Sequence, residues 1–472
     1  MTLSAIDTGI IIASLEWLFV GYFLFLHGSH TFLAAVSVNS LRLRMESVAV
    51  KMLPRLSAGY EIPVSIIVPV SEPTQELAPF VQSLFGLDYP EFEVIVVIDT
   101  EDSENLSQLQ TAFELVMFPE AYWRQVRART VHSVYRSPRL PALRVLDKKP
   151  GGPGDAINAG INAARYPIVC IAHADSVLKR DSLRRLVPYF LEDASTIGAG
   201  TAEHVANGSF IVNGFLERCR LSGNPLVWMQ ATASLRRDLC SRYGWAVPNA
   251  MLTISDRFCA FRKEAVVQVG GCLRSAVNPI LELVARLHRA NTVIDRRYRI
   301  AFLPAPVLWR HMPSTPAAVC RGMASEHSGL SDALKVNRDL FWGRNSGLVG
   351  RLAFPFTKLT EVAGPLIELL AWTFFVAGFA LDLVSGQHLV VFAVCAAGLG
   401  VLVSWLAILI DAFVFRTYQS AGSYALLLIS AIFENAGFRQ LITFCALPGL
   451  RPRAADHAGM RKQRPVERRP TD

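Results

Sequence analysis

Charged residues are scarce in this 472-residue sequence. Asp, Glu, Lys and Arg make up only 18% of the chain, against 51% for the hydrophobic residues. Such a balance excludes a disordered protein and is unusual for an enzyme that is soluble throughout. It is typical of a soluble domain joined to membrane-spanning segments, and the length leaves room for more than one domain.

Paired cysteines are also missing. The eight cysteines are scattered, and no two of them form a CxxC pair. This spacing indicates neither a zinc site nor a disulfide framework. The sequence also lacks a basic stripe interleaved with aromatic residues, so we expect no nucleic-acid partner.

The positive charge is concentrated at the C-terminal end. Residues 448–472 contain seven Lys or Arg and three acidic residues, a surplus of four within the net charge of +8. A basic tail beside membrane segments predicts a cytoplasmic location and attraction to anionic membrane lipid.

An N-terminal apolar run is long enough to span a membrane. It covers residues 9–27 and carries a single acid, Glu16. The basic residues Arg42 and Arg44 follow it, and the positive-inside bias then places the next domain in the cytoplasm. The sequence therefore predicts a multi-pass protein of the plasma (inner) membrane.

The C-terminal part contains further apolar runs. We expect spans at 362–384 and 388–410. The run at 421–447 has Glu434 and Arg439 in its middle, so we expect a re-entrant or interfacial helix pair there. This gives four regions: an anchor at 1–45, a cytoplasmic domain at 60–345, interfacial and transmembrane helices at 346–447, and the basic cytoplasmic tail at 448–472.

The middle region begins with a strand–helix–strand pattern. Residues 64–70 and 92–99 are short, continuous apolar runs, typical of buried parallel strands, and a helical stretch at about 75–86 separates them. Ligands of such sheets bind at the carboxyl ends of the strands, which is where Asp99 stands.

A second helix–strand unit follows, and its strand also ends in polar residues. A Gly-rich turn at 150–155 precedes an expected helix at 156–164 and a strand at 166–172. The strand is followed by His173-Ala174-Asp175, again at a carboxyl end.

These segments, taken in order, resemble the membrane-bound family 2 glycosyltransferases, which include cellulose, hyaluronan and poly-N-acetylglucosamine synthases. The resemblance implies a GT-A fold, a mixed α/β domain that binds a nucleotide-sugar of the UDP type, mounted on interfacial and transmembrane helices. It covers nearly the whole chain and rests on the first strand with Pro69, LDYPEFEVIVV at 87–97, GDAINAGINAARYP at 154–167, FRKEAVVQVGG at 261–271, ELVARLHR at 282–289 and ENAGFRQL at 434–441.

The resemblance assigns two acids to the nucleotide. Asp99 matches the acid that contacts the base, with a strand-end turn residue as the alternative interpretation. Asp155 matches a second nucleotide-contacting acid, although the lysine that the family carries two residues earlier is Pro153 here. The alternative for Asp155 is a cap on the helix that starts at Ala156.

The metal-binding D-x-D motif of the family is altered. His173-Ala174-Asp175 retains only the second acid. Asp175 and His173 could together hold a divalent metal, Mg²⁺ or Mn²⁺, with the imidazole favouring Mn²⁺. A weak or absent metal site is the other expectation.

The acid that the family uses as general base is also missing. Its motif is replaced by Pro279 and Ile280, and Glu282 is expected to point away from the site, about 200° around the helix from Ile280. Asp256, where the family usually has glycine, is a candidate for a relocated base.

The family's Q-x-x-R-W motif has no counterpart. The corresponding segment, residues 320–330, keeps Arg321 and has Glu326 in the place of the tryptophan. A carboxylate there would repel the diphosphate of a nucleotide-sugar.

We therefore predict a membrane-anchored homologue with impaired catalysis, a pseudo-glycosyltransferase in cell-surface polysaccharide synthesis. It would act as partner or regulator of an active glycosyltransferase or of polysaccharide-assembly proteins. One alternative is an active inverting glycosyltransferase that uses Asp256 as base and His173 with Asp175 for metal. Another is a membrane scaffold that binds no nucleotide.

Overall fold

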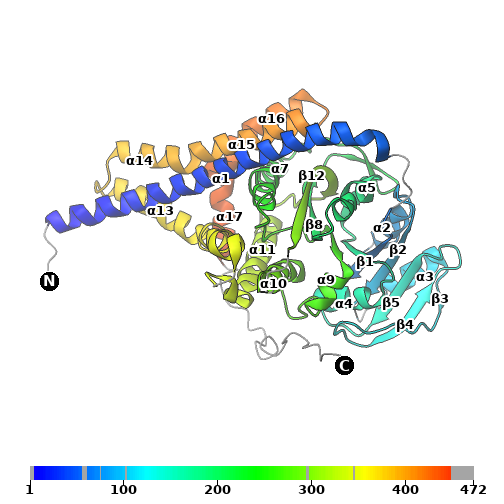
Figure 1. Ribbon diagram of the computed structural model, residues 1–472. Helices are drawn as coiled ribbons and strands as arrows, with labels where there is room; N and C mark the ends of the chain where they lie inside the picture. The colour runs from blue at the N-terminus through cyan, green and yellow to red at the C-terminus, as the bar shows by residue number, and fades with distance from the viewer. Residues whose placement is uncertain are drawn as a thin grey trace.

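The chain folds into an α/β domain with a group of long helices along one side (Figure 1). The basic tail at 448–472 lies outside the described residues, so its predicted location stays a prediction. The computed structural model describes residues 5–55, 61–74, 76–100, 104–293, 297–343 and 346–447.

A single mixed sheet organises the domain. Within the described part of the chain it has twelve strands, in the order β3-β4-β5-β2-β1-β6-β11-β8-β12-β7-β10-β9. The strands are β1 (Val64–Val70), β2 (Phe92–Ile98), β3 (Val116–Met117), β4 (Val131–Arg136), β5 (Leu143–Lys148), β6 (Ile168–Ala172), β7 (Ser176–Leu178), β8 (Thr196–Val205), β9 (Phe210–Val212), β10 (Phe215–Arg218), β11 (Phe258–Arg262) and β12 (Arg299–Arg310).

The predicted strand–helix–strand unit is confirmed. Strands β1 and β2 are parallel, with Val64 opposite Phe92, and helix α2 (Leu77–Leu84) connects them. Strand β6 pairs in parallel with the other side of β1. These apolar runs form central strands because both of their faces are buried, as in sheets covered by helices on each side.

The strand directions bring the carboxyl ends of several strands to one edge of the sheet, which is where such sheets bind ligands. Strand β11 is antiparallel to both β6 and β8, and β12 is parallel to β8. The start of β11 therefore lies at the same edge as the ends of β1, β2, β6, β8 and β12. Loops from six strands meet there.

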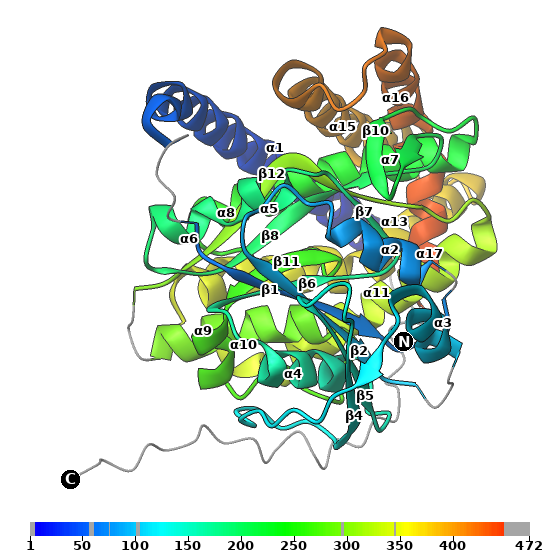
Figure 2. The same ribbon diagram turned by 90° about the vertical axis from the view of Figure 1, so that its right-hand side faces the viewer.

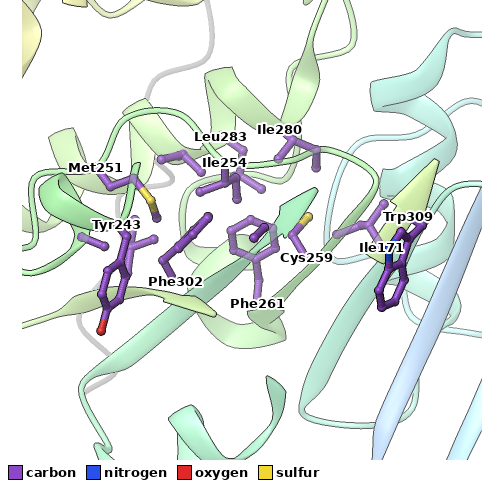
Figure 3. Close-up of a cluster of buried hydrophobic side chains, with 14 of the residues drawn as sticks. Ile171, Tyr243, Met251, Ile254, Cys259, Phe261, Ile280, Leu283, Phe302 and Trp309 are labelled. Atoms are coloured by element: carbon purple, nitrogen blue, oxygen red, sulfur yellow. The ribbon is translucent and has the colours of Figure 1, made fainter. Parts of the chain in front are cut away.

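Helices cover both faces of this sheet (Figure 2). Helices α4 (Pro153–Ala163) and α10 (Pro279–Val293) pack on one face, and α2, α3 (Glu104–Phe113) and α5 (Ser182–Leu186) pack on the other. Figure 3 shows part of the first core, where Phe261 and Phe302 of the sheet lie beside Ile254 and Leu283. The two cores hold the sheet edge in a fixed geometry.

Several helices are long and apolar enough to cross a membrane. By length and composition the described residues contain three, Gly9–Leu43 in α1 (Ala5–Arg55), Gly386–Phe415 and Ala421–Ala446. A fourth candidate is the pair Val349–Val362 and Gly364–Ala380, which is bent by 49°. Figure 1 shows α1 running beside α13 (Gly364–Ala380) and α15 (Leu399–Ile410).

The bounds of these helices differ from those of the predicted spans. The run expected at 362–384 reaches spanning length only with the bent segment before it. The segment expected to be re-entrant, 421–447, is long enough to cross but is interrupted by non-helical backbone at Ala436 and Gly437. Its re-entrant assignment remains a prediction.

The structure contains one disulfide that the cysteine spacing did not indicate. Cys320 of α11 (Pro316–Val336) is bonded to Cys445 of α17 (Arg439–Ala446). The cysteine spacing gave no signal for this single bond, because the partners lie 125 residues apart and only the folded chain brings them together. The bond ties the α/β domain to the last apolar helix.

Candidate functional site

Charged side chains from five strands line the edge where the parallel strands end. Asp99 directly follows β2, Asp175 follows β6 after a short turn, and Arg257 directly precedes β11. Glu203 stands near the end of β8, and Arg310 is the last residue of β12. The sequence placed Asp99, Asp155, His173 and Asp175 in one site, whereas Glu203, Arg257 and Arg310 were not identified.

The two acids assigned to the nucleotide share one buried lysine. The ammonium of Lys148 contacts Asp99 and lies 2.8 Å from Oδ2 of Asp155. Arg274 adds a second cation, with its Nε 2.9 Å from Oδ1 of Asp155. The backbone N–H of Gly151 donates to Asp99 at 2.8 Å. Both carboxylates are therefore neutralised from within the protein.

Asp155 does not act as the cap of its helix. Helix α4 begins at Pro153, earlier than expected, and its N-cap is Gly152, with no side-chain cap bond. The Asp155 carboxylate instead accepts the backbone N–H of Arg129 at 3.1 Å. The capping alternative for Asp155 is wrong.

Asp99 retains one unused acceptor. Its Oδ2 is buried and has no hydrogen-bond partner among the residues that the structure describes. Buried polar atoms are almost always satisfied, so this oxygen can accept one further hydrogen bond from a water molecule or a ligand. An N–H group of a nucleotide base has the required chemistry.

The altered metal motif is occupied by an arginine. The guanidinium of Arg257 contacts Asp175, and its Nε lies 3.6 Å from Oδ1 of Asp256. Asn278 donates to the other oxygen of Asp256 at 3.2 Å. Burial lowers the pKa of His173, so its imidazole is neutral at neutral pH.

These residues do not fit a divalent metal. Across the described ranges, no group of three or more His, Cys, Asp or Glu side chains is arranged to hold an ion. The carboxylate of Asp175 faces a guanidinium, and a metal placed beside it would be repelled by that charge. The His173–Asp175 metal site and the alternative of a weak or absent Mg²⁺ or Mn²⁺ site both stay predictions.

A cavity of about 660 Å³ adjoins Asp256 and Arg257. It extends from the sheet edge to the apolar helices, so one continuous space connects the two parts of the protein. Its charged and titratable lining comes from the domain (Glu203, Arg236, Arg237, Arg242, Asp256, Arg257, Arg310, Glu326, His327) and from the helices (Tyr22, His27, His30, Glu361, Glu368, Arg439).

Glu326 is paired with arginines from other elements. Its carboxylate lies 3.4 Å from Arg310 and 3.7 Å from Arg237, which belongs to the short helix η1 (Arg236–Arg242). Burial opposes ionisation of the neighbouring Glu203, but Arg310 and Arg237 outweigh it and lower the pKa of that carboxyl. The sequence comparison found only Arg321 left of the family's arginines in this segment. It missed Arg310 and Arg237, which reach Glu326 from other parts of the chain.

The missing base is not replaced from α10. Ile280 is buried in the hydrophobic core near Leu283 (Figure 3). Glu282 is also buried and pairs with Arg286 at 2.7 Å. Of the two acids considered as a replacement base, Asp256 lines the cavity and Glu282 is not part of its lining.

Comparisons with known proteins agree with this architecture. The model of the family described as "Glycosyltransferase like family 2" matches residues 62–328. Poly-beta-1,6-N-acetyl-D-glucosamine synthases of Staphylococcus aureus strains COL and N315 are each 27% identical over 167 residues. The match covers 35% of this chain and 35% of each relative, so it spans about a third of their length.

A solved structure has the same fold. It is a mannosyltransferase from Pyrobaculum calidifontis in complex with GDP-Man and Mn²⁺. The two are 15% identical, with a TM-score of 0.51, and the match covers 88% of this chain and 99% of the other. At this identity the similarity supports the GT-A type of fold alone.

Proposed function

This chain belongs to the family 2 glycosyltransferases, and from that premise we propose that it takes part in assembling a cell-surface polysaccharide while its own transfer chemistry is impaired. It binds a nucleotide-sugar and acts as partner or regulator of an active glycosyltransferase or of other polysaccharide-assembly proteins. The relatives named as poly-beta-1,6-N-acetyl-D-glucosamine synthases support a polysaccharide as the product of that assembly.

The observation that carries the impairment is the contact between Arg257 and Asp175. A guanidinium stands where the family places its metal, and the buried Ile280 stands where it places its base. Loss of a general base reduces a rate by about 10²–10⁴. Loss of one preorganised charge contact reduces it by about 10²–10³. The two losses need not add, but either alone would leave a synthase slow.

A second candidate is an active inverting transferase with Asp256 as the base. One feature favours it: Asp256 lines the cavity, and Asn278 orients its carboxylate by a hydrogen bond of 3.2 Å. A general base needs this kind of position, within reach of an acceptor hydroxyl. A membrane scaffold that binds no nucleotide is the third candidate, and the unused Asp99 oxygen speaks against it.

Turnover separates the first two candidates. We expect the purified full-length protein to release no nucleoside diphosphate above background from UDP- or GDP-sugars, with Mg²⁺ or with Mn²⁺. The Asp256→Asn variant serves as the matched control. Release by the wild type that disappears in Asp256→Asn would overturn the impairment and establish the active transferase.

A further inference from the structure

We infer that Arg257 takes the place of a divalent cation and binds the diphosphate of a nucleotide ligand. The inference rests on the proposed function, because it requires the domain to bind a nucleotide. It assigns to Arg257 a binding role that the family gives to a metal ion.

The first support is position along the sheet edge. The strands run in the order β2-β1-β6-β11, and neighbouring strands lie about 4.8 Å apart. Asp99, with its unused buried oxygen, follows β2, and Arg257 precedes β11, three spacings or about 14 Å away. Arg257 lines the cavity. A nucleotide that reaches from Asp99 towards the cavity therefore brings its phosphates to this guanidinium.

The second support is the chemistry of the side chain. A guanidinium is permanently charged, and its planar fork matches two phosphate oxygens. The Nε atom of Arg257 is buried and lacks a hydrogen-bond partner within the described ranges, so a donor is available. Burial alone would lower the pKa of this guanidinium, but Asp175 and Asp256 raise it.

The third support is that Asp175 can be displaced at little cost. Its side chain is 52% exposed, whereas that of Arg257 is 23% exposed. An ion pair with an exposed partner contributes little stability, because water competes for the charge of that partner. A diphosphate can therefore exchange with the Asp175 carboxylate.

The other nearby acids already have partners. Glu203 contacts Arg310 and lies 3.7 Å from Arg237, and both arginines also pair with Glu326. Their charges are compensated within the protein. Asp175, and Asp256 with its Oδ1 3.6 Å from Nε of Arg257, are therefore the carboxylates with which a phosphate competes.

This geometry reverses the expected effect of Asp175. If Asp175 held a metal, its removal would weaken diphosphate binding. If Asp175 competes with phosphate for Arg257, its neutralisation leaves the affinity unchanged or raises it. The sign of one substitution thus distinguishes the two arrangements.

The test is calorimetry on the detergent-solubilised full-length protein. Uridine is compared with UDP, and guanosine with GDP, in EDTA and again with Mg²⁺ or Mn²⁺. We expect at least one diphosphate to bind about tenfold more tightly than its nucleoside in EDTA. Arg257→Gln should lose this difference while retaining nucleoside binding, which also shows that the variant is folded. Asp175→Asn should keep or enlarge the difference.

Arg299→Gln is the matched control. Arg299 is a partly exposed arginine at the start of β12, at the opposite edge of the sheet, 3.8 Å from Asp193. Removing this charge should leave all affinities unchanged. A diphosphate advantage that requires metal and is lost in Asp175→Asn, or one that survives Arg257→Gln, would overturn the inference. Nucleoside binding with no gain from the diphosphate would overturn the inference alone. No binding of any of these ligands would overturn the proposed function as well.

Discussion

Lys148 organises the part of the site that the sequence analysis assigned to the nucleotide. It is fully buried, and its ammonium contacts both Asp99 and Asp155. Charges buried at this depth are tolerated only when they are paired and hydrogen-bonded. Lys148 therefore supplies the positive charge that allows both carboxylates to stay ionised while buried.

Replacing this lysine should be strongly destabilising. Lys148→Met leaves two buried carboxylates without their shared cation, and breaking a buried pair in this way costs about 3–5 kcal/mol. Lys149→Met is the matched control, because Lys149 is the exposed neighbour in sequence. Thermal unfolding of the detergent-solubilised protein measures both. Equal melting temperatures for the two variants would show that Lys148 is not required.

At the level of single residues, the sequence identified acids better than it identified their partners. Asp99 and Asp175 were recognisable because each follows an apolar strand, and that position is local in the chain. Arg257 and Arg310 were missed because their proximity depends on which strands pair. One local signal was present for Arg257. The residue before it, Asp256, stands where the family usually has glycine, so this part of the chain was already marked as unusual.

At the level of elements, apolar runs predicted strands well. The expected strands at 64–70 and 92–99 correspond to β1 and β2, because central parallel strands are apolar along their whole length. Helix α4 starts three residues earlier than expected, since Pro153 suits the first turn of a helix and Asp155 is not its cap.

The charges in the segment 421–447 were harder to interpret. Glu434 and Arg439 argued against a span, but each has an ion-pair partner in the fold. Arg236 lies 2.6 Å from Glu434, and Arg439 lies 3.1 Å from Glu368. Paired charges can be accommodated at depths where isolated ones cannot. Their presence therefore does not decide whether this segment crosses the membrane.

Helix α10 contains a histidine that makes the domain sensitive to acid. Nε2 of His288 lies 2.9 Å from the carbonyl oxygen of Met251, and Nδ1 lies 2.8 Å from the hydroxyl of Tyr298. Burial lowers the pKa of His288 to about 4, although its bond to Met251 acts in the opposite direction. Between pH 6.5 and 4 the unfolded chain binds a proton that the folded chain excludes. Stability therefore falls as the pH drops through this range, by up to ~3 kcal/mol.

We expect His288→Gln to reduce this pH dependence. The variant should lose less stability than the wild type between pH 7.5 and 5, because glutamine keeps polar contacts but does not titrate. Melting temperatures at several pH values measure the slope. Identical slopes in both proteins would assign the acid sensitivity to other buried groups, such as His173, whose pKa burial also lowers.

At the level of the whole molecule, the number of membrane crossings decides where the chain ends. In the predicted topology, the anchor and the spans at 362–384 and 388–410 would make three crossings and would place residues 448–472 on the same side as the α/β domain, in the cytoplasm. A crossing by Ala421–Ala446 would put the tail outside. The positive charge of the tail favours the first arrangement.

Cysteine labelling of intact cells tests this arrangement. A cysteine introduced at Gly459 should resist a membrane-impermeant reagent, with the unmodified protein as the background measurement. A cysteine at Gln387 should react, because the predicted topology puts the short connection between the spans 362–384 and 388–410 outside. Labelling at Gly459 to the same extent as at Gln387 would overturn the predicted topology.

The disulfide between Cys320 and Cys445 sets a condition on the same prediction. Disulfides are rare in the reducing cytosol. The predicted cytoplasmic location implies a reducing environment, whereas a stable Cys320–Cys445 bond requires an oxidising one.

When the Cys320–Cys445 disulfide is formed, the polypeptide contains a covalently closed loop. Residues 320 to 445 form a covalent ring that holds the candidate spans of the described residues, apart from the N-terminal one and the final residue of the last. A protease that cuts once inside the ring yields two pieces that still migrate together until a reductant is added. The ring also orders biosynthesis, because its second cysteine leaves the ribosome only after all of these helices have been made.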